Sequence, residues 1–141
     1  MFRTVLVTTD FSTNSAVAIQ PALAIAQKFG ARIVLVHVIE APGADAGHDS
    51  RDAFRGLADM AREQLEEFGG REIGEKVPWT PDVAVGPAYL AITDAAKRHG
   101  ADLIVVATHG RTGVLHLLLG SVAERVVRTA TCPVLTVRVP S

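Results

Sequence analysis

The sequence predicts an α/β fold, a Rossmann-like parallel sheet of five strands in the order 3-2-1-4-5 with helices on both faces. Two observations predict it. Short apolar runs alternate with longer helical patterns from one end of the 141-residue chain to the other. Right-handed crossovers then restrict the strand order, and 3-2-1-4-5 is the usual doubly wound solution. We expect residues 1–141 to form a single domain.

The first half of the chain predicts two strands and two helices, in the order Thr4–Thr8, Ser12–Phe29, Ile33–Val38 and Asp52–Phe68. Gly30 is a typical residue for closing the first helix. Pro21 removes a backbone donor inside that helix, so we expect a kink or a break into two helices there. Gly69 and Gly70 are expected to stop the second helix.

The second half predicts three strands and two helices, over Thr80–Val85, Pro87–His99, Leu103–Val106, Ser121–Ala130 and Pro133–Val139. Gly86 and Pro87 open the first of these helices, because proline suits a first turn. Residues 41–50 are rich in Gly, Ala and Asp and predict a loop. Residues 71–81 contain one glycine and two prolines and predict an irregular connector.

Composition limits the classes of function. Hydrophobic residues make up 48% and charged residues 21%, which is typical of a soluble globular protein. The net charge of −1 gives no general attraction to nucleic acid or to an anionic membrane. No apolar run approaches the roughly 18 residues of a membrane span. Met1 leads directly into a strand and is expected to leave no room for a signal peptide, and a single cysteine excludes an internal disulfide, so we expect a cytoplasmic protein. That cysteine, Cys132, is expected to be a packing residue.

The most informative segment runs from Ala107 to Ser121 and reads ATHGRTGVLHLLLGS. It leaves an apolar strand and ends at the start of a helix. Free N–H groups and the positive end of the helix dipole make such a junction an anion site. Gly110 and Gly120 would let a phosphate approach the backbone, and Ser121 offers a hydroxyl. The alternative is that Gly120 and Ser121 form only a turn and a cap.

The spacing of this segment resembles the nucleotide loop of the universal stress protein family. In that family a glycine, two residues, a second glycine and nine residues precede Gly-Ser or Gly-Thr. Here Gly110, nine residues and Gly120-Ser121 match, whereas Ala107 stands where the first glycine is expected. The resemblance extends over nearly the whole chain, through the opening Val5-Leu6-Val7-Thr8-Thr9-Asp10-Phe11-Ser12, His37-Val38-Ile39, and the closing Cys132-Pro133-Val134-Leu135.

The resemblance implies a regulatory domain of the stress response that binds ATP, alone or with Mg²⁺, and acts through nucleotide-dependent conformation or choice of protein partner. It also implies a homodimer that pairs the C-terminal edge strand with its copy. The nucleotide-binding residues that we expect are Thr8, Thr9, Asp10, Val38, Val106, Ala107, Gly110, Arg111, Gly120, Ser121 and Val122.

Asp10 follows the first strand and is expected at the nucleoside end of the ligand. A lone carboxylate repels phosphates but accepts hydrogen bonds from ribose hydroxyls or from adenine. The alternative for Asp10 is the N-cap of the first helix, where aspartate is also favoured. The two roles are compatible.

Catalytic motifs are not evident. The chain has no GxxxxGK[ST] sequence, so no P-loop lysine reaches the phosphates, and its histidines share no metal-ligand spacing. We therefore expect at most slow ATP hydrolysis. The main alternative function is a nucleotide-free dimeric interaction module of the same fold. A phosphoacceptor receiver domain is disfavoured, because the third strand ends Val85-Gly86-Pro87 without the required aspartate.

Overall fold

The computed structural model describes residues 1–40, 49–108 and 120–139, with side chains omitted at 49–54. In chain order the elements are β1 (Thr4–Thr8), α1 (Thr13–Phe29), β2 (Arg32–Ile39), α2 (Asp49–Glu72), β3 (Trp79–Val85), α3 (Ala88–His99), β4 (Leu103–Ala107), α4 (Ser121–Thr129) and β5 (Val134–Val137). Strands and helices therefore alternate as the sequence predicts.

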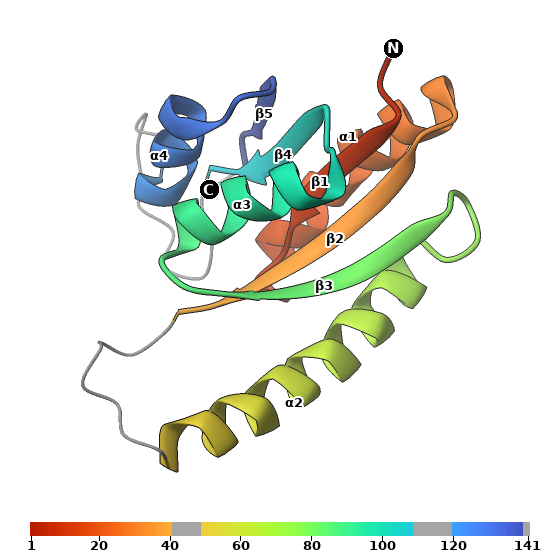
Figure 1. Cartoon of the computed structure of the whole chain (residues 1–141). Coiled ribbons are helices and arrows are strands. Elements are labelled where there is room, and N and C mark those ends of the chain that lie inside the picture. Colours follow the sequence, from red (N-terminus) through yellow and green to blue (C-terminus); the bar gives the residue numbers. More distant parts are fainter. Residues whose placement is uncertain (41–48, 109–119, 140–141) are drawn as a thin grey trace.

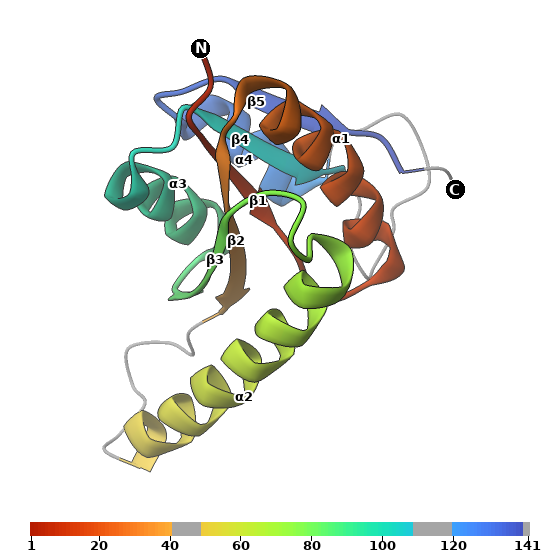
Figure 2. The same ribbon diagram turned by 90° about the vertical axis from the view of Figure 1, so that its right-hand side faces the viewer.

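The five strands form one parallel sheet in the order β3-β2-β1-β4-β5. Its central strand is β1, in which Val5 pairs with Ile33 on one side and with Leu103 on the other. Helices α1 and α2 cover one face of the sheet, and α3 and α4 cover the other (Figures 1 and 2). The predicted fold class and strand order are confirmed.

Two apolar layers form the core, one on each face of the sheet. In β1 the side chains of Val5 and Val7 pack in the layer of α1 and α2, whereas Leu6 packs in the layer of α3 and α4. All three side chains are fully buried. Successive side chains of a strand point to opposite faces, so a strand covered on both sides needs apolar residues at every position. This explains the unbroken apolar runs in the sequence.

Helix α1 is continuous, so of the two alternatives predicted at Pro21, a kink or a break, the break into two helices does not occur. The helix begins after the cap residue Ser12, whose hydroxyl accepts a hydrogen bond from the Ser15 N–H at 3.1 Å. It ends at Gly30, whose φ of 66° is left-handed, as predicted. Proline removes one backbone bond, but burial of the apolar face of α1 against the sheet offsets that loss; the buried apolar residues are Ala18, Ile19, Ala22, Leu23 and Ala26.

Helix α2 differs most from its prediction. It begins at Asp49 and runs through Gly69 and Gly70 to Glu72, so the expected stop after Phe68 is wrong. Gly69 is buried beneath the indole of Trp79, where a Cβ would lie less than 3.0 Å from three ring atoms. The absence of a side chain at Gly69 therefore allows α2 to pack closely against Trp79 of β3. The predicted connector at 71–81 is correspondingly shorter.

The two edge strands also differ from their predicted limits. Strand β3 begins at Trp79 and includes Pro81, which an edge strand tolerates because one side of its backbone has no partner strand. Strand β5 covers Val134–Val137 and is shorter than the predicted run to Val139. The N-terminal half of α2 projects beyond the sheet (Figure 1). None of the described helices is long and apolar enough to cross a membrane.

Candidate functional site

Those predicted site residues that the structure describes lie at the carboxyl ends of the strands, at one edge of the sheet. β1 and β4 are parallel neighbours, so their carboxyl ends meet where the strand order reverses. Thr8 is the last residue of β1 and Ala107 the last of β4, with Val106 just before it. Val38 lies near the end of β2 on the other side of β1. Ligands of open α/β sheets bind in such a crevice.

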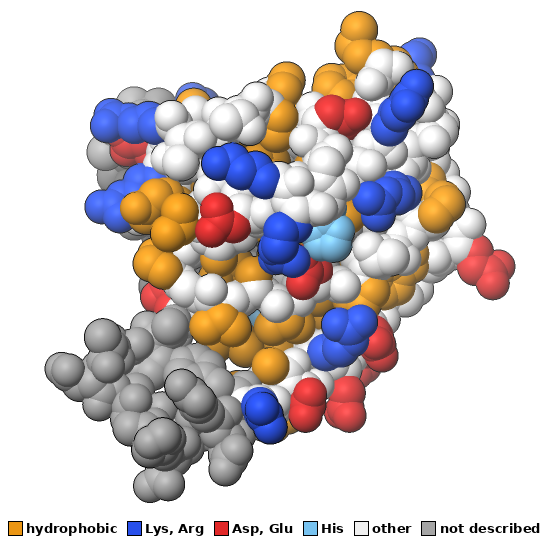
Figure 3. All heavy atoms as spheres, in the orientation of Figure 1, with side chains coloured by type: hydrophobic (Ala, Val, Ile, Leu, Met, Phe, Trp, Pro, Cys, Tyr) orange, Lys and Arg blue, Asp and Glu red, His pale blue; other side chains and the backbone are white. Residues whose placement is uncertain are grey.

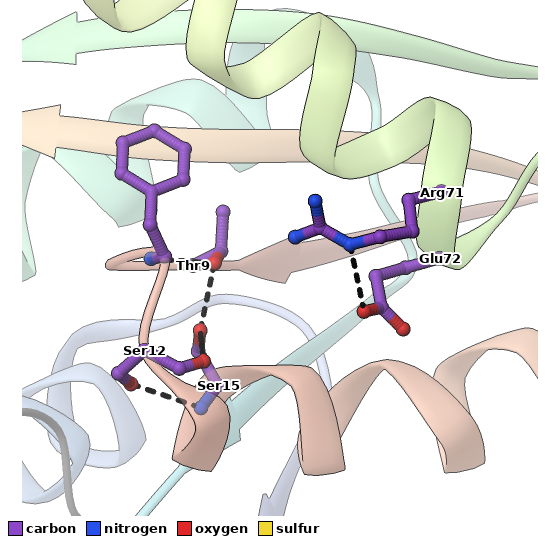
Figure 4. A network of polar contacts seen from close by, with 6 residues as sticks. Thr9, Ser12, Ser15, Arg71 and Glu72 are labelled. Atoms are coloured by element: carbon purple, nitrogen blue, oxygen red, sulfur yellow. Dashed lines mark hydrogen bonds and ion pairs between the residues drawn. The ribbon is translucent and has the colours of Figure 1, made fainter.

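Hydrogen bonds of the backbone and of short polar side chains hold the turn between β1 and α1. The Thr9 N–H donates to the Val36 carbonyl at 2.9 Å. The Phe11 N–H donates to the Thr9 hydroxyl, and the Ser12 N–H donates to Asp10 Oδ1, both at 2.9 Å. The Thr9 and Ser15 hydroxyls share a buried bond of 2.7 Å (Figure 4). The turn therefore holds Asp10 at the edge of the sheet.

Asp10 is not the N-cap of α1. That role belongs to Ser12, whose side chain reaches the first turn of the helix. The carboxylate of Asp10 instead accepts from the Ser12 N–H within the turn itself. Of the two roles considered for Asp10 from the sequence, the cap is therefore wrong.

An aromatic stack supports this turn from the α1 and α2 side. The ring of Phe11 lies on that of His37, with centroids 4.3 Å apart and planes 26° apart, and its edge meets Phe68 of α2. His37 Nδ1 donates to the Thr9 carbonyl at 2.8 Å. Phe11 has a φ of 67°, an unfavourable left-handed conformation for a bulky residue. Stacking and hydrogen bonds maintain this strained backbone next to Asp10.

The start of α4 is an uncapped helix end beside the β4 terminus. The Gly120 N–H donates to the Thr108 carbonyl at 2.9 Å, and a Cβ on Gly120 would overlap that carbonyl oxygen. Gly120 is the N-cap and supplies no side-chain acceptor. Ser121 and Val122 follow it and are exposed. Among the residues that the structure describes, no side chain caps the first N–H groups of α4, which carry the positive end of the helix dipole.

Thr108 adds a buried hydroxyl to this region. Its side chain is 5% exposed, and its Oγ1 has no hydrogen-bond partner within the described part of the chain. Buried hydroxyls nearly always have a hydrogen-bond partner. A buried hydroxyl without one near a helix end is therefore a candidate contact for a polar ligand. The predicted site residues Gly110 and Arg111 lie outside the described residues.

A cavity of about 390 Å³ opens beside the first turn of α4. It is lined by Glu40, residues 86–89, Ser121, Val122 and Arg125. The guanidinium of Arg125 lies 5.2 Å from the centre of the Tyr89 ring. The sequence predictions include Ser121 and Val122 but miss the other lining residues. A helical spacing of four from Ser121 could have indicated Arg125, because such residues share one face of a helix.

Basic side chains are spread over the face that carries α3 and α4, with acidic side chains among them (Figure 3). Several of these charges neutralise one another. Asp82 of β3 contacts Arg98 at 3.2 Å and His99 at 2.8 Å. Glu124 contacts Arg128 at 2.7 Å along α4. Two arginines of this face, Arg98 and Arg128, are thus paired with carboxylates.

Cys132 lies between α4 and β5, and its thiol is free. It packs against the apolar layer of α3 and α4. Burial, together with the nearby carboxylate of Asp102, raises the pKa of the Cys132 thiol. That carboxylate is itself fixed by the Arg3 and Thr4 N–H groups at 2.9 and 3.2 Å. A raised pKa makes this cysteine a weak nucleophile, as its predicted packing role requires.

Comparison with known proteins agrees with this geometry. The model of the universal stress protein family matches residues 1–138. Universal stress protein MJ0531 of Methanocaldococcus jannaschii is 31% identical over 99% of this chain and 84% of its own length. Universal stress protein A homolog 2 of Coxiella burnetii is 33% identical over 98% of this chain and 96% of its own length.

Solved structures share the fold. Protein MJ0577 of M. jannaschii superposes with a TM-score of 0.84 at 26% identity, covering 100% of this chain and 99% of that one. A universal stress protein in complex with cAMP has a TM-score of 0.69 at 24% identity and covers 99% of both chains. An Arabidopsis thaliana family member with AMP bound has a TM-score of 0.69 at 23% identity, covering 99% of this chain and 93% of that one. From its sequence and its fold together, the chain belongs to the universal stress protein family.

Proposed function

We propose that this domain binds ATP, alone or with Mg²⁺, and acts in the stress response through nucleotide-dependent conformation or choice of protein partner. The observation that carries the proposal is the start of α4, which no described side chain caps and whose Gly120 N–H contacts the Thr108 carbonyl at the carboxyl edge of the sheet. The N–H groups and dipole of a helix N-terminus stabilise phosphate. Universal stress proteins solved with cAMP and with AMP support an adenine nucleotide as the ligand.

The residues at this edge fit such a ligand. Gly120 leaves no side chain between the backbone and a phosphate, and the exposed Ser121 offers a hydroxyl donor. The carbonyl of Thr108 accepts from the Gly120 N–H, and its buried hydroxyl has no hydrogen-bond partner among the described residues. Asp10, on the neighbouring strand end, suits the nucleoside. Among the described residues no cluster of three His, Cys, Asp or Glu side chains could hold a metal, so Mg²⁺ would arrive with the phosphates.

Isothermal titration calorimetry tests the phosphate contact. Ser121→Ala removes a hydrogen bond to a charged group, which lowers ATP affinity by about ten- to a hundredfold, or roughly 1.5–3 kcal/mol. Equal affinity of the variant and the parent would remove Ser121 from the site. If ATP produces no heat and no rise in melting temperature with the parent, the nucleotide-free interaction module becomes the better function.

The orientation of the nucleotide is tested at Asp10. With the carboxylate at the nucleoside, Asp10→Ala weakens ATP, ADP and adenosine by similar factors. If the variant instead binds ATP more tightly and adenosine equally, Asp10 lies beside the phosphates and the proposed orientation is reversed.

We also propose a homodimer through β5, in the cytoplasm. Strand β5 is a sheet edge whose Val134, Leu135 and Val137 side chains are half-buried, and an open apolar edge is a liability unless it is paired. A two-fold axis pairs the strand with itself in closed symmetry. Light scattering should give twice the mass of the chain, and Thr136→Pro or Val137→Pro should disrupt the dimer, depending on which N–H faces the partner. A monomer at tens of micromolar with ATP present would contradict the proposal.

The free thiol of Cys132 suits a reducing compartment such as the cytoplasm.

A further inference from the structure

The cavity beside α4 contains an arginine without an acidic partner. Within the described chain Arg125 forms no ion pair, whereas Arg98 and Arg128 each contact a carboxylate. Glu124, the carboxylate next to Arg125 in the sequence, is occupied by Arg128 at 2.7 Å. The Arg125 guanidinium lies instead over the Tyr89 ring, at the wall of the cavity. This charge is therefore held in place but left unneutralised.

The position of Arg125 extends the positive end of α4. Ser121 and Arg125 are four residues apart and share one face of the helix, and both line the cavity. The helix dipole and the guanidinium thus act on the same space. Among the described lining residues, Glu40 is the one carboxylate; it follows the last residue of β2 and is exposed, as Arg125 is.

The size of the cavity distinguishes between a single small anion and a larger group. At about 390 Å³ it falls within the range of roughly 300–1,000 Å³ that small-molecule sites occupy. One phosphate bound at Ser121 would leave most of this space empty. A chain of phosphates that begins at Ser121 would continue into it and reach Arg125.

We propose that this cavity receives the outer phosphates of the nucleotide and that Arg125 makes the domain select nucleoside triphosphates over monophosphates. The inference rests on the proposed ATP function, because it extends the same site along α4. Guanidinium and phosphate form paired, charge-assisted hydrogen bonds. Tyr89 is a positioning residue that holds the guanidinium over its ring and so reduces the entropy lost on binding.

Calorimetry with ATP, ADP and AMP tests the selection. Arg125→Gln should lower ATP affinity by about ten- to a hundredfold and AMP affinity by less than about twofold. Arg128→Gln is the matched control: it removes the same charge from the same helix but does not line the cavity, and it should change each affinity by less than about twofold. Tyr89→Phe keeps the ring and should keep the preference for ATP, whereas Tyr89→Leu should reduce it severalfold.

The outcomes separate the two proposals. If the parent binds ATP but Arg125→Gln matches Arg128→Gln, the selection by Arg125 is wrong and the ATP site at Ser121 stands. If Arg125→Gln weakens ATP and AMP equally, Arg125 does not contact the outer phosphates and the inference fails. A parent that binds no nucleotide defeats both proposals. Circular dichroism of each variant verifies that the fold is intact.

Discussion

The two adjacent glycines of α2 give a sharp test of the packing. Both lie inside one helix, where alanine is favoured over glycine by about 0.5–1 kcal/mol. At Gly70, which is exposed, an added Cβ meets no atom within 4 Å. Gly70→Ala should therefore stabilise the protein by about 0.5–1 kcal/mol. At the buried Gly69 the same methyl group overlaps the Trp79 ring.

Overpacking costs about 1–3 kcal/mol, and the indole cannot swing aside freely because its Nε1 donates to the Gly74 carbonyl at 3.2 Å. After subtraction of the helix-propensity gain, Gly69→Ala should destabilise the protein by up to about 2.5 kcal/mol and should in any case be less stable than Gly70→Ala. Urea unfolding followed by the fluorescence of Trp79, the single tryptophan, measures both changes. If both variants gain stability equally, the close approach of Trp79 to α2 is wrong.

Three further perturbations have expected results. Ser12→Ala removes the cap of α1 and should lower the free energy of unfolding by about 1 kcal/mol in urea titration; no change would mean that the Ser15 N–H finds another acceptor. Gly120→Ala places a methyl group on the Thr108 carbonyl and should destabilise the protein by about 1–3 kcal/mol, and unaltered stability would contradict the close turn. Cys132 should react with thiol reagents at neutral pH more slowly than glutathione does, because burial raises its pKa. In the unfolded state the Cys132 thiol ionises near its ordinary pKa of 9.0, whereas in the folded state its pKa is higher. Above about pH 9 the unfolded state therefore binds fewer protons than the folded state, and the free energy of unfolding falls as the pH rises. Cys132→Ser should remove this contribution to the fall.

The strand order could be predicted because the apolar runs and the right-handed crossover rule act together. The sheet and its two apolar layers follow from apolar runs such as Val5–Val7, which have no polar face. The limits of α2 could not be predicted, since local rules treat Gly69 and Gly70 as helix breakers. Each glycine costs the helix about 1 kcal/mol, and the stabilisation from burying Phe68 and Trp79 next to them is larger. Pro21 is a similar case, in which tertiary packing outweighs one missing backbone bond.

Some residues of the candidate site could be predicted from local sequence signals, and others could not. Gly120 and Ser121 are recognisable because their chemistry is local: a glycine turn followed by a helix start. Tyr89 and Arg125 come from different helices and meet only after α3 and α4 pack side by side. Spacing along the chain carries no signal for such a pair. The stack of Phe11 on His37 was likewise beyond local patterns, because it joins β2 to a left-handed residue after β1.

The bond between His37 and the Thr9 carbonyl selects one tautomer of the imidazole. A carbonyl oxygen can only accept a hydrogen bond, so the proton of the neutral His37 ring lies on Nδ1. The lone pair of that ring then lies on Nε2, the nitrogen that faces away from the Thr9 carbonyl. The same bond orients the ring that stacks on Phe11, so the turn beside Asp10 and the face of the imidazole are fixed together.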